Sequence, residues 1–229
     1  AHNMGECDGK IAFVTGASRG IGRAIAYRFA AEGAAVVVCA SRMGSHGDLQ
    51  GTLEETVSTI QANGGKAAGI ACDLSDPAAR VGLVERAADF FGPIDILVNN
   101  AAGTHMKLPS QCTTEERSFM FDMNVNGPID LAQQAIPNMK EKGTGWILNI
   151  SSATARQPEV PYRDSKLAAW VIGPYGSTKS ALNRYTEALA HEVASDGIFV
   201  NAMAPTSIVL TSGAAYVRDI ARKNPDMAE

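Results

Sequence analysis

The stretch that decides the fold is Lys10–Gly22, KIAFVTGASRGIG, in which an apolar run ends in a cluster of glycines. The run Lys10–Thr15 has the length and the apolar character of a buried strand. The glycines follow at the spacing G-x-x-x-G-x-G, and from Gly20 to Glu32 apolar residues recur with the period of a helix. A strand, a glycine turn and a helix in this order predict the first half of a βαβ unit.

The same alternation continues along the rest of the chain. Further strands are expected at Ala35–Ala40, Lys66–Cys72, Ile94–Asn99, Gly145–Ser151 and Ile198–Met203. The helices expected between them are Thr52–Asn63, Pro77–Phe91, Thr114–Glu141 and Tyr175–Ala194, with an irregular segment at Ala153–Pro174. Strands that are apolar throughout, separated by amphipathic helices, are typical of a parallel sheet covered on both faces. They predict an α/β fold, a doubly wound parallel sheet of Rossmann type with three α/β/α layers, in a single domain over residues 1–229.

Composition excludes several other classes of protein. The chain has 229 residues, a formal charge of −4 and 45 % hydrophobic residues, which argues against a disordered chain and against a nucleic-acid binder that relies on positive charge. Its cysteines, Cys7, Cys39, Cys72 and Cys112, lack the spacing of metal ligands or of a disulfide scaffold, and no apolar stretch is long enough to span a bilayer. We therefore expect a cytoplasmic protein with no metal, no nucleic acid and no membrane among its partners.

The glycine turn has the features of a phosphate cradle. Gly16 permits a tight exit from the strand, Gly20 lets a pyrophosphate approach the backbone, and Gly22 lets the helix pack close to the sheet. Amide groups and the positive end of the helix then face the anion. Ser18 and Ile21 lie in the same turn and are expected to contact a dinucleotide. The alternative is a glycine-rich turn that binds no ligand.

The choice of dinucleotide depends on charge at the end of the second strand. An acidic residue there would bind a ribose 2′-hydroxyl and repel a 2′-phosphate, but this chain has Ala40-Ser41-Arg42. Arg19 in the glycine turn is expected on the same side. Two guanidinium groups and the Ser41 hydroxyl favour a 2′-phosphate, and so NADP(H) over NAD(H). The alternative is two solvated surface arginines.

Tyr175 and Lys179 are four positions apart in Y-x-x-x-K, so they share one face of the penultimate helix. A phenol titrates near pH 10, and a nearby ammonium, together with a positively charged nicotinamide when the cofactor is oxidised, can bring its pKa toward the neutral range that acid–base catalysis needs. Tyr162 and Lys166 form a second Y-x-x-x-K. We expect Tyr175 to be the functional tyrosine, because it begins a long helix that leads into the last strand.

Taken in order, these motifs resemble the short-chain dehydrogenase/reductase family. The resemblance also rests on Asn99-Asn100-Ala101 after a strand, Asn124 in M-N-V-N-G and Ser151-Ser152 after another strand, and it runs from about Lys10 to Pro205. It implies an NADP-preferring oxidoreductase that transfers a hydride between nicotinamide and a carbonyl or secondary-alcohol substrate. It also implies a homodimer or homotetramer built through the two longest helices.

The resemblance assigns catalytic roles to four residues. Tyr175 would exchange a proton with the substrate oxygen, and Lys179 would hold the nicotinamide ribose and lower the pKa of Tyr175. Ser152 would donate a hydrogen bond to the substrate oxygen. Asn124 would bind a water that relays protons, and the alternative is that it is a packing amide or marks a helix kink.

The resemblance also implies the contacts of the cofactor. Asp73 would meet the adenine amino group, or cap the helix at Pro77, or do both. Asn99 would lie beside the adenosine ribose and Ile208 beside the nicotinamide carboxamide. The full set expected at the cofactor is Gly16, Ser18, Arg19, Gly20, Ile21, Ser41, Arg42, Asp73, Leu74, Asn99, Ala101, Tyr175, Lys179 and Ile208.

The chain departs from the family pattern in three places. Ser152 and Tyr175 are farther apart than usual, so residues within Gln157–Gly173, Trp170 among them, are expected beside the site as a substrate wall or subunit contact. Thr206 stands where the family commonly has glycine. Relatives continue beyond Glu229, so we expect an incomplete C-terminal end.

The competing functions are a non-catalytic dinucleotide sensor or scaffold on the same fold, and a lyase or epimerase.

Overall fold

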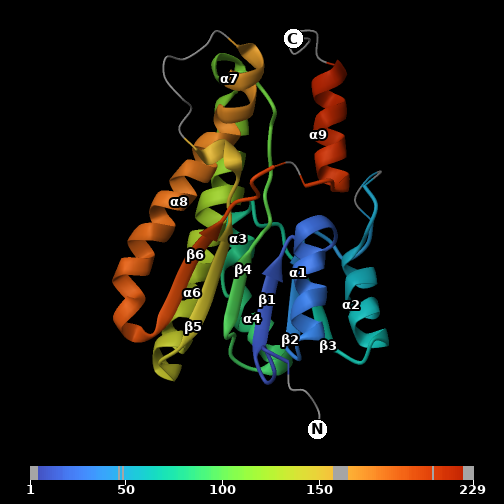
Figure 1. Cartoon of the computed structure of the whole chain (residues 1–229), viewed down its shortest axis with the longest axis vertical. Coiled ribbons are helices and arrows are strands. Elements are labelled where there is room, and N and C mark those ends of the chain that lie inside the picture. Colours follow the sequence, from blue (N-terminus) through green and yellow to red (C-terminus); the bar gives the residue numbers. More distant parts are fainter. Residues whose placement is uncertain (1–4, 46, 48, 157–164, 208, 224–229) are drawn as a thin grey trace.

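The computed structural model describes residues 5–45, 47, 49–156, 165–207 and 209–223, and in this part of the chain it has one parallel sheet (Figure 1). The strand order is β3-β2-β1-β4-β5-β6. The strands are β1 (Ile11–Thr15), β2 (Ala35–Ala40), β3 (Lys66–Ala71), β4 (Ile96–Asn99), β5 (Gly145–Ile150) and β6 (Ile198–Met203). Val14 of β1 pairs with Val38 of β2 on one side and with Val98 of β4 on the other. The predicted doubly wound parallel sheet is confirmed.

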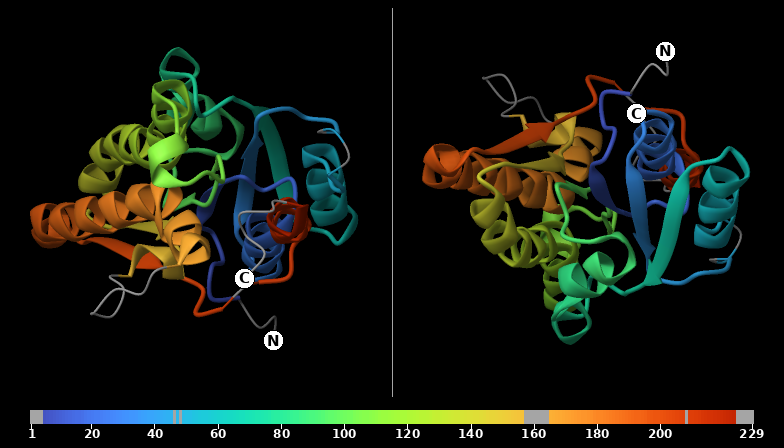
Figure 2. Two further views of the ribbon diagram at one scale, coloured as in Figure 1. Left: turned by 90° about the horizontal axis from the view of Figure 1, so that it is seen from above. Right: turned by 90° about the horizontal axis from the view of Figure 1, so that it is seen from below.

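Helices cover both faces of this sheet, as the views from above and below show (Figure 2). They are α1 (Gly20–Ala31), α2 (Leu53–Ala62), α3 (Pro77–Arg80), α4 (Leu83–Phe91), α5 (Thr114–Phe121), α6 (Gly127–Lys142), α7 (Lys166–Ile172), α8 (Pro174–Val193) and α9 (Ser212–Lys223). Successive residues of β1 point to opposite faces: Phe13 joins the core under α4, α6 and α8, and Val14 the core under α1 and α2. The three layers are those that the sequence predicts. In the described ranges, no helix is both long and apolar enough to cross a membrane.

Two predicted helices are interrupted, and both interruptions have local causes. The helix expected over Pro77–Phe91 breaks at Gly82, which has a positive φ of 65° and separates α3 from α4. The helix expected over Thr114–Glu141 contains the π-helical turn Asp122–Asn126 between α5 and α6. Pro128 follows this turn and has no N–H for the carbonyl four residues earlier, so the regular α-helical bonding cannot pass through it. β4 begins at Ile96 and not at Ile94.

The segment expected to be irregular contains a helix. Its described part includes α7, which begins after Ser165, whose Oγ accepts the Ala168 N–H at 3.1 Å. The serine cap is a usable signal, but the apolar pattern is short and ends at Gly173-Pro174, so the sequence alone does not suggest a helix. Trp170 is 3 % exposed, so its side chain packs in the interior of the chain and has little surface left for contact with another subunit.

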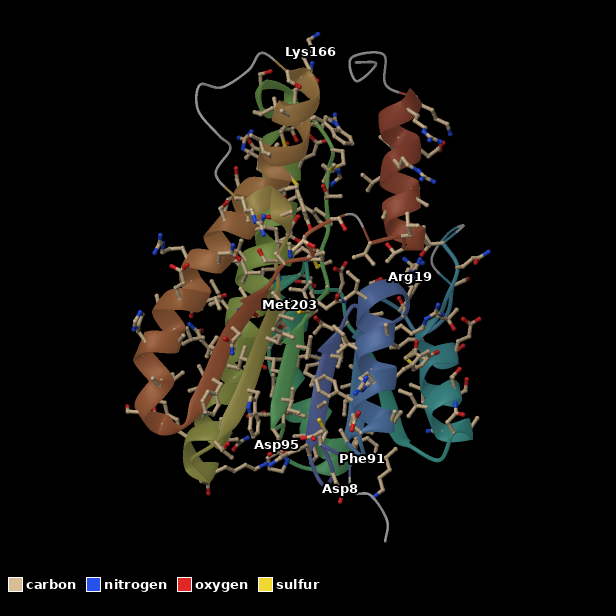
Figure 3. The ribbon with its side chains drawn as sticks, viewed as in Figure 1. Asp8, Arg19, Phe91, Asp95, Lys166 and Met203 are labelled. Atoms are coloured by element: carbon tan, nitrogen blue, oxygen red, sulfur yellow. The ribbon has the colours of Figure 1, made fainter. Side chains whose placement is uncertain are left out.

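The sheet places the loops of the site at one edge. All the strands are parallel, so their carboxyl ends lie together, with Arg19 and Met203 at this edge and Asp95 and Asp8 at the opposite one (Figure 3). The chain passes from β3 at the outer edge of the sheet to β4 beside β1, which makes the space above β1 and β4 the topological switch point. Ligands of open α/β sheets bind at such a point.

Candidate active site

The glycine turn after β1 has a shape that only glycine allows. Gly16 and Gly20 have φ values of 65° and 56°, in the left-handed region. A Cβ at Gly16 would lie 2.8 Å from the Cα of Ala101, and a Cβ at Gly22 would collide with the carbonyl oxygen of Gly16. The backbone therefore approaches the end of β4 closely, and at its glycine positions the turn presents main-chain groups without a side chain, which fits a pyrophosphate.

Asn100 and Thr15 hold this turn in place. Asn100 Nδ2 donates to the carbonyl oxygens of Thr15 at 3.0 Å and Gly16 at 3.1 Å. Thr15 Oγ1 accepts the N–H groups of Asn100 at 3.0 Å and Ala101 at 3.1 Å. The sequence motif includes Asn100 but assigns it no function. The available signal is a second amide residue directly after a strand that ends beside the glycine turn.

The start of α1 carries a positive charge, Arg19, for which the described residues supply no acidic partner. Arg19, its N-cap residue, makes no capping bond with its side chain among the described residues, so the first amides remain available to an anion. Arg19 Nε lies 3.3 Å from the Oγ of the buried Ser18, while its Nη1 is buried without a partner in the described ranges. Burial and, second, the neighbouring charge of Arg23 lower the pKa of Arg19. The site fits an anionic group, and the charge of Arg23 adds to the positive potential at Arg19.

The side chains after β2 face solvent. Ser41 and Arg42 are exposed, directly beyond the end of the strand. Ile21 is half-buried in the first turn of α1. Contacts of these residues with a 2′-phosphate or pyrophosphate stay predictions.

At the end of β3, the cap of the next helix is not Asp73. Asp76 Oδ1 accepts the Ala78 N–H at 2.9 Å and caps α3, so the capping alternative for Asp73 is wrong. Asp73 is exposed, and its Oδ1 accepts the N–H and the hydroxyl of Ser75 at 3.0 and 2.7 Å. The side chain of Leu74 is buried in the core. Asp73 is thus held in a turn at the sheet edge, where a base could reach it.

Asn99 directs its side chain to the interior of the protein. Its Nδ2 donates to Asn149 Oδ1 at 2.9 Å and to the carbonyl oxygen of Pro128 at 3.3 Å. The residue is 3 % exposed, so the predicted contact with a ribose rests on its backbone. Ile208 and Tyr162 lie outside the described residues.

Tyr175 and Lys179 lie one turn apart near the start of α8. Lys179 Nζ is 5.8 Å from the centroid of the Tyr175 ring and donates to the carbonyl oxygen of Ile150 at 2.8 Å. The lysine is 2 % exposed. This hydrogen bond fixes the start of α8 against the carboxyl end of β5, directly before the two serines.

The loop with Ser152 packs against the same end of α8. A Cβ at Gly176 would lie 2.6 Å from the carbonyl oxygen of Thr154, and Ser180 Oγ donates to the carbonyl of Ala155 at 3.0 Å. Ser152 Oγ accepts the N–H and the hydroxyl of Thr154 at 3.2 and 2.9 Å. Its own proton is then left to donate to a substrate oxygen.

Asn124 connects the π-helical turn to α8. It is fully buried; its Oδ1 accepts the Gly103 N–H at 2.9 Å, and its Nδ2 donates to the Gly103 carbonyl at 2.8 Å and to Thr178 Oγ1 at 3.0 Å. Thr178 Oγ1 in turn donates to the carbonyl of Tyr175 at 2.7 Å. The amide group is fully engaged, so the predicted water contact would fall to the backbone carbonyl, to which Pro128 cannot donate.

Burial dominates the proton affinities of the Tyr–Lys pair. It raises the pKa of Tyr175 to about 12 and lowers the pKa of Lys179 to about 8. In the chain without a cofactor, burial is the cause that raises the pKa of Tyr175. The expectation that Lys179, together with an oxidised nicotinamide, lowers this pKa stays a prediction. Within the described part of the chain, no group of three His, Cys, Asp or Glu side chains could hold a metal ion.

The glycine turn lies at the switch point of the sheet and has a shape that fits a pyrophosphate. The Tyr–Lys pair and the Ser152 hydroxyl lie at the end of a nearby strand. Nicotinamide-dependent oxidoreductases of Rossmann type combine these two features. Residues 10–220 match the short chain dehydrogenase family, and the chain belongs to that family.

Its relatives include both curated proteins and solved structures. Glucose 1-dehydrogenase 2 of Bacillus subtilis (strain 168) is 35 % identical over 217 residues, which are 94 % of this chain and 78 % of that protein. Hydroxysteroid dehydrogenase-like protein 2 of Xenopus laevis is 33 % identical over 99 % of this chain, which spans only 54 % of that relative. The structure of L-sorbose reductase from Gluconobacter frateurii, complexed with NADPH and L-sorbose, has a TM-score of 0.79 at 32 % identity and matches over 97 % of this chain and 78 % of its own.

Proposed function

We propose that the chain is an NADP(H)-dependent oxidoreductase that transfers a hydride between nicotinamide and a small carbonyl or secondary-alcohol substrate, with Tyr175 as general acid and base. The observation that carries the proposal is the hydrogen bond from Lys179 Nζ to the Ile150 carbonyl, which holds the Tyr–Lys pair at the end of β5 beside Ser152. When bound, the cofactor would supply the hydride in reduction, as NADPH, and accept it in oxidation, as NADP⁺.

The residues of the chain would align the substrate and move its proton. Ser152 donates to the substrate oxygen, and Tyr175 gives this oxygen a proton in reduction and removes one in oxidation. Lys179 stabilises the phenolate that forms when Tyr175 loses its proton. A second cation, such as the oxidised nicotinamide ring, is needed beside it, because burial alone raises the pKa of Tyr175 to about 12.

The preference for NADP(H) over NAD(H) rests on the arginines. Arg19 has a buried guanidinium nitrogen without a partner in the described residues, and no acidic residue follows β2 in Ala40-Ser41-Arg42. Such groups suit a 2′-phosphate. The NADPH in the sorbose reductase structure supports this choice. Assembly as a homodimer or homotetramer, as the family suggests, and a cytoplasmic location also belong to the proposal.

Tyr175→Phe tests the reaction directly. We expect the loss of one hydroxyl to lower kcat by about 10²- to 10⁴-fold, the usual contribution of a general acid–base group, while NADPH binding is retained. The measurement is NADPH oxidation against ketones, aldehydes, sugars and 3-oxoacyl thioesters. Tyr185→Phe, a half-buried tyrosine on the same helix, is the matched control and should keep full activity.

Two outcomes would contradict parts of this proposal. Turnover that survives in Tyr175→Phe would remove Tyr175 from the acid–base role. Tight NADPH binding by the wild type without turnover of any substrate class would favour a sensor or scaffold on the same fold.

A further inference from the structure

Arg80, the last residue of α3, is a buried cation outside the residues used so far. The residue is 2 % exposed. Its Nε donates to Asp130 Oδ2 at 2.7 Å, and its Nη1 donates to the carbonyl oxygens of Leu74 at 2.7 Å and Asp122 at 3.4 Å. Nη2 lies 3.8 Å from Asp122 Oδ1. One guanidinium thus connects α3, the loop after β3, the π-helical turn and α6.

The local backbone is built around this contact. The helix that the sequence predicts over Pro77–Phe91 breaks directly after Arg80, and the left-handed Gly82 redirects the chain into α4. The Arg80 carbonyl accepts Gln134 Nε2 at 3.0 Å, which binds the break to α6. Burying a guanidinium is costly unless every donor finds an acceptor, and a hydrophobic residue would fill the space at a lower cost in desolvation. The arrangement therefore indicates a role that depends on the directions of the guanidinium bonds.

The two ends of the guanidinium meet two different parts of the site. Leu74 follows Asp73 in the loop where adenine is expected. Asp122 begins the π-helical turn that carries Asn124, and Asn124 reaches Thr178 and through it the Tyr175 carbonyl.

Close packing leaves this connection little freedom. A Cβ at Gly127 would lie 3.5 Å from the Leu74 carbonyl oxygen, 3.6 Å from Arg80 Cδ and 3.2 Å from the Asp122 carbonyl oxygen. The loop after β3 that contains Asp73 and Leu74, here called the adenine-side loop, is therefore separated from the end of the π-helical turn by no more than the width of one methyl group at this point. The Arg80 bonds to the Leu74 and Asp122 carbonyl oxygens cross this narrow junction.

We propose that Arg80 is a positioning residue that ties the adenine-side loop to the π-helical turn, so that binding of the adenosine half of NADP(H) sets the geometry of the catalytic half. The inference rests on the proposed function, because it needs NADP(H) as the ligand. Arg80 does not touch the reacting atoms; it acts through Leu74 at one end and through Asn124 and Thr178 at the other. Lysine cannot replace it fully, because an ammonium has no planar fork to bond a carboxylate and a carbonyl in fixed directions.

The test is hydrogen exchange with and without NADPH, measured on the wild type and on Arg80→Met, together with kcat and KM. In the wild type NADPH should slow exchange both in the glycine turn 15–22 and in the turn 120–128. In Arg80→Met the protection at 15–22 should remain, the added protection at 120–128 should disappear, and kcat should fall on the order of tenfold to a hundredfold, as for displaced catalytic groups. Arg80→Lys should recover part of both.

Matched variants separate coupling from folding. Arg28→Met removes a surface arginine paired with Glu32 at 2.7 Å and should change neither readout. Asp130→Asn keeps the arginine and an oxygen acceptor for its Nε, and removes only the charge of a side chain that is 39 % exposed, so this variant is expected to fold even if Arg80→Met does not. It should show a partial loss of protection at 120–128.

The outcomes distinguish the inference from the function on which it rests. If NADPH protects 15–22 and 120–128 equally well in the wild type, Arg80→Met and Asp130→Asn, Arg80 does not position the turn and the inference is overturned. If NADPH protects nothing in the wild type, the proposed function fails and the inference fails with it. Loss of the protection at 120–128 alone supports the inference.

Discussion

The two halves of the site are stabilised in different ways. Around the glycine turn, main-chain geometry dominates: Gly16 and Gly20 adopt left-handed conformations, and Asn100 Nδ2 bonds to two backbone carbonyls. Around Tyr175, buried side chains dominate: Lys179 and Asn124 each use their polar atoms to join distant segments. The first half is therefore sensitive to added atoms, and the second to lost hydrogen bonds and to charge.

The difference corresponds to what each half has to do. A pyrophosphate carries its charge into the site and needs only amides and space, which a short local motif can provide. A proton-transfer site must hold a phenol, an ammonium and a hydroxyl in one arrangement, which requires contacts between elements far apart in the chain. Added atoms therefore test the half around the glycine turn, here called the phosphate half. Lost hydrogen bonds and changed charges test the half around Tyr175, here called the catalytic half.

The largest effect is expected from Gly22→Ala in the phosphate half. The new methyl group would collide with the Gly16 carbonyl oxygen and the Asn100 amide. Both are fixed by hydrogen bonds, so the turn must open. We expect the free energy of unfolding to fall by about 3 kcal/mol, at the upper end of overpacking, and NADPH binding to be lost. Urea denaturation and fluorescence titration measure the two effects.

Gly44→Ala is the control for this comparison. A Cβ added at Gly44 would meet no atom of the described residues within 4 Å, and Gly44 does not have a positive φ. Its substitution should therefore change the free energy of unfolding by less than about 0.5 kcal/mol. Equal effects of the two substitutions would show that the glycine turn is not closely packed.

Sequence reasoning worked well for the phosphate half, because that half is local. The strand, the glycine spacing and the helix lie within Lys10–Ala31. Gly16 makes the tight exit and Gly22 the close packing that their positions predict, while the approach of a pyrophosphate to Gly20 stays a prediction. The fold class followed from the same alternation repeated along the chain. The role of Asn100 is not predicted, because its partners Thr15 and Gly16 come from a segment 84 to 85 positions away.

The catalytic half was predicted by resemblance more than by physics. The break after Arg80 could not be seen, because Gly82 alone is compatible with a helix interior and the Asp130 contact comes from 50 positions away. The same holds for Asn124, whose partners are Gly103 and Thr178. The burial that raises the pKa of Tyr175 cannot be predicted either, since the sequence spacing shows the neighbouring cation but not the loss of hydration.

A smaller effect than that of Gly22→Ala is expected from the buried charge of Lys179, in the half of the site around Tyr175. Burial lowers the pKa of Lys179 from 10.5 to about 8. Between these values the unfolded chain holds one more proton on this side chain than the folded chain, so the free energy of unfolding rises with pH. From pH 8 to pH 10 we expect the wild type to gain roughly 2 to 3 kcal/mol relative to Lys179→Met.

The pH range of the experiment is limited by Lys179 and Tyr175 together. Above pH 10 the raised pKa of Tyr175 has the opposite effect, because the folded chain then keeps a proton that the unfolded chain loses. The measurement is therefore denaturant unfolding of both proteins at pH 7, 8, 9 and 10. Below pH 8 the difference between them should be constant. Parallel curves up to pH 10 would mean that burial does not lower the pKa of Lys179.

The smallest effect is expected from Arg42→Asp, which changes an exposed charge at the edge of the phosphate half. An acidic residue after β2 repels a 2′-phosphate and accepts a hydrogen bond from a 2′-hydroxyl, so the ratio of kcat/KM for NADPH over NADH should fall by about tenfold. The change should shrink at high salt, because exposed charges are screened. Steady-state kinetics with both cofactors at two salt concentrations measures it.

Two further variants sharpen this last prediction. Arg184→Asp, on the exposed side of α8, makes the same charge change away from the glycine turn and should leave the ratio unaltered. Arg19→Ala should lower the ratio more than Arg42→Asp, since Arg19 is half-buried and one of its nitrogens has no partner in the described residues. If Arg42 and Arg19 can both be replaced without a change in the ratio, the positive charge at this end of the site does not select the cofactor.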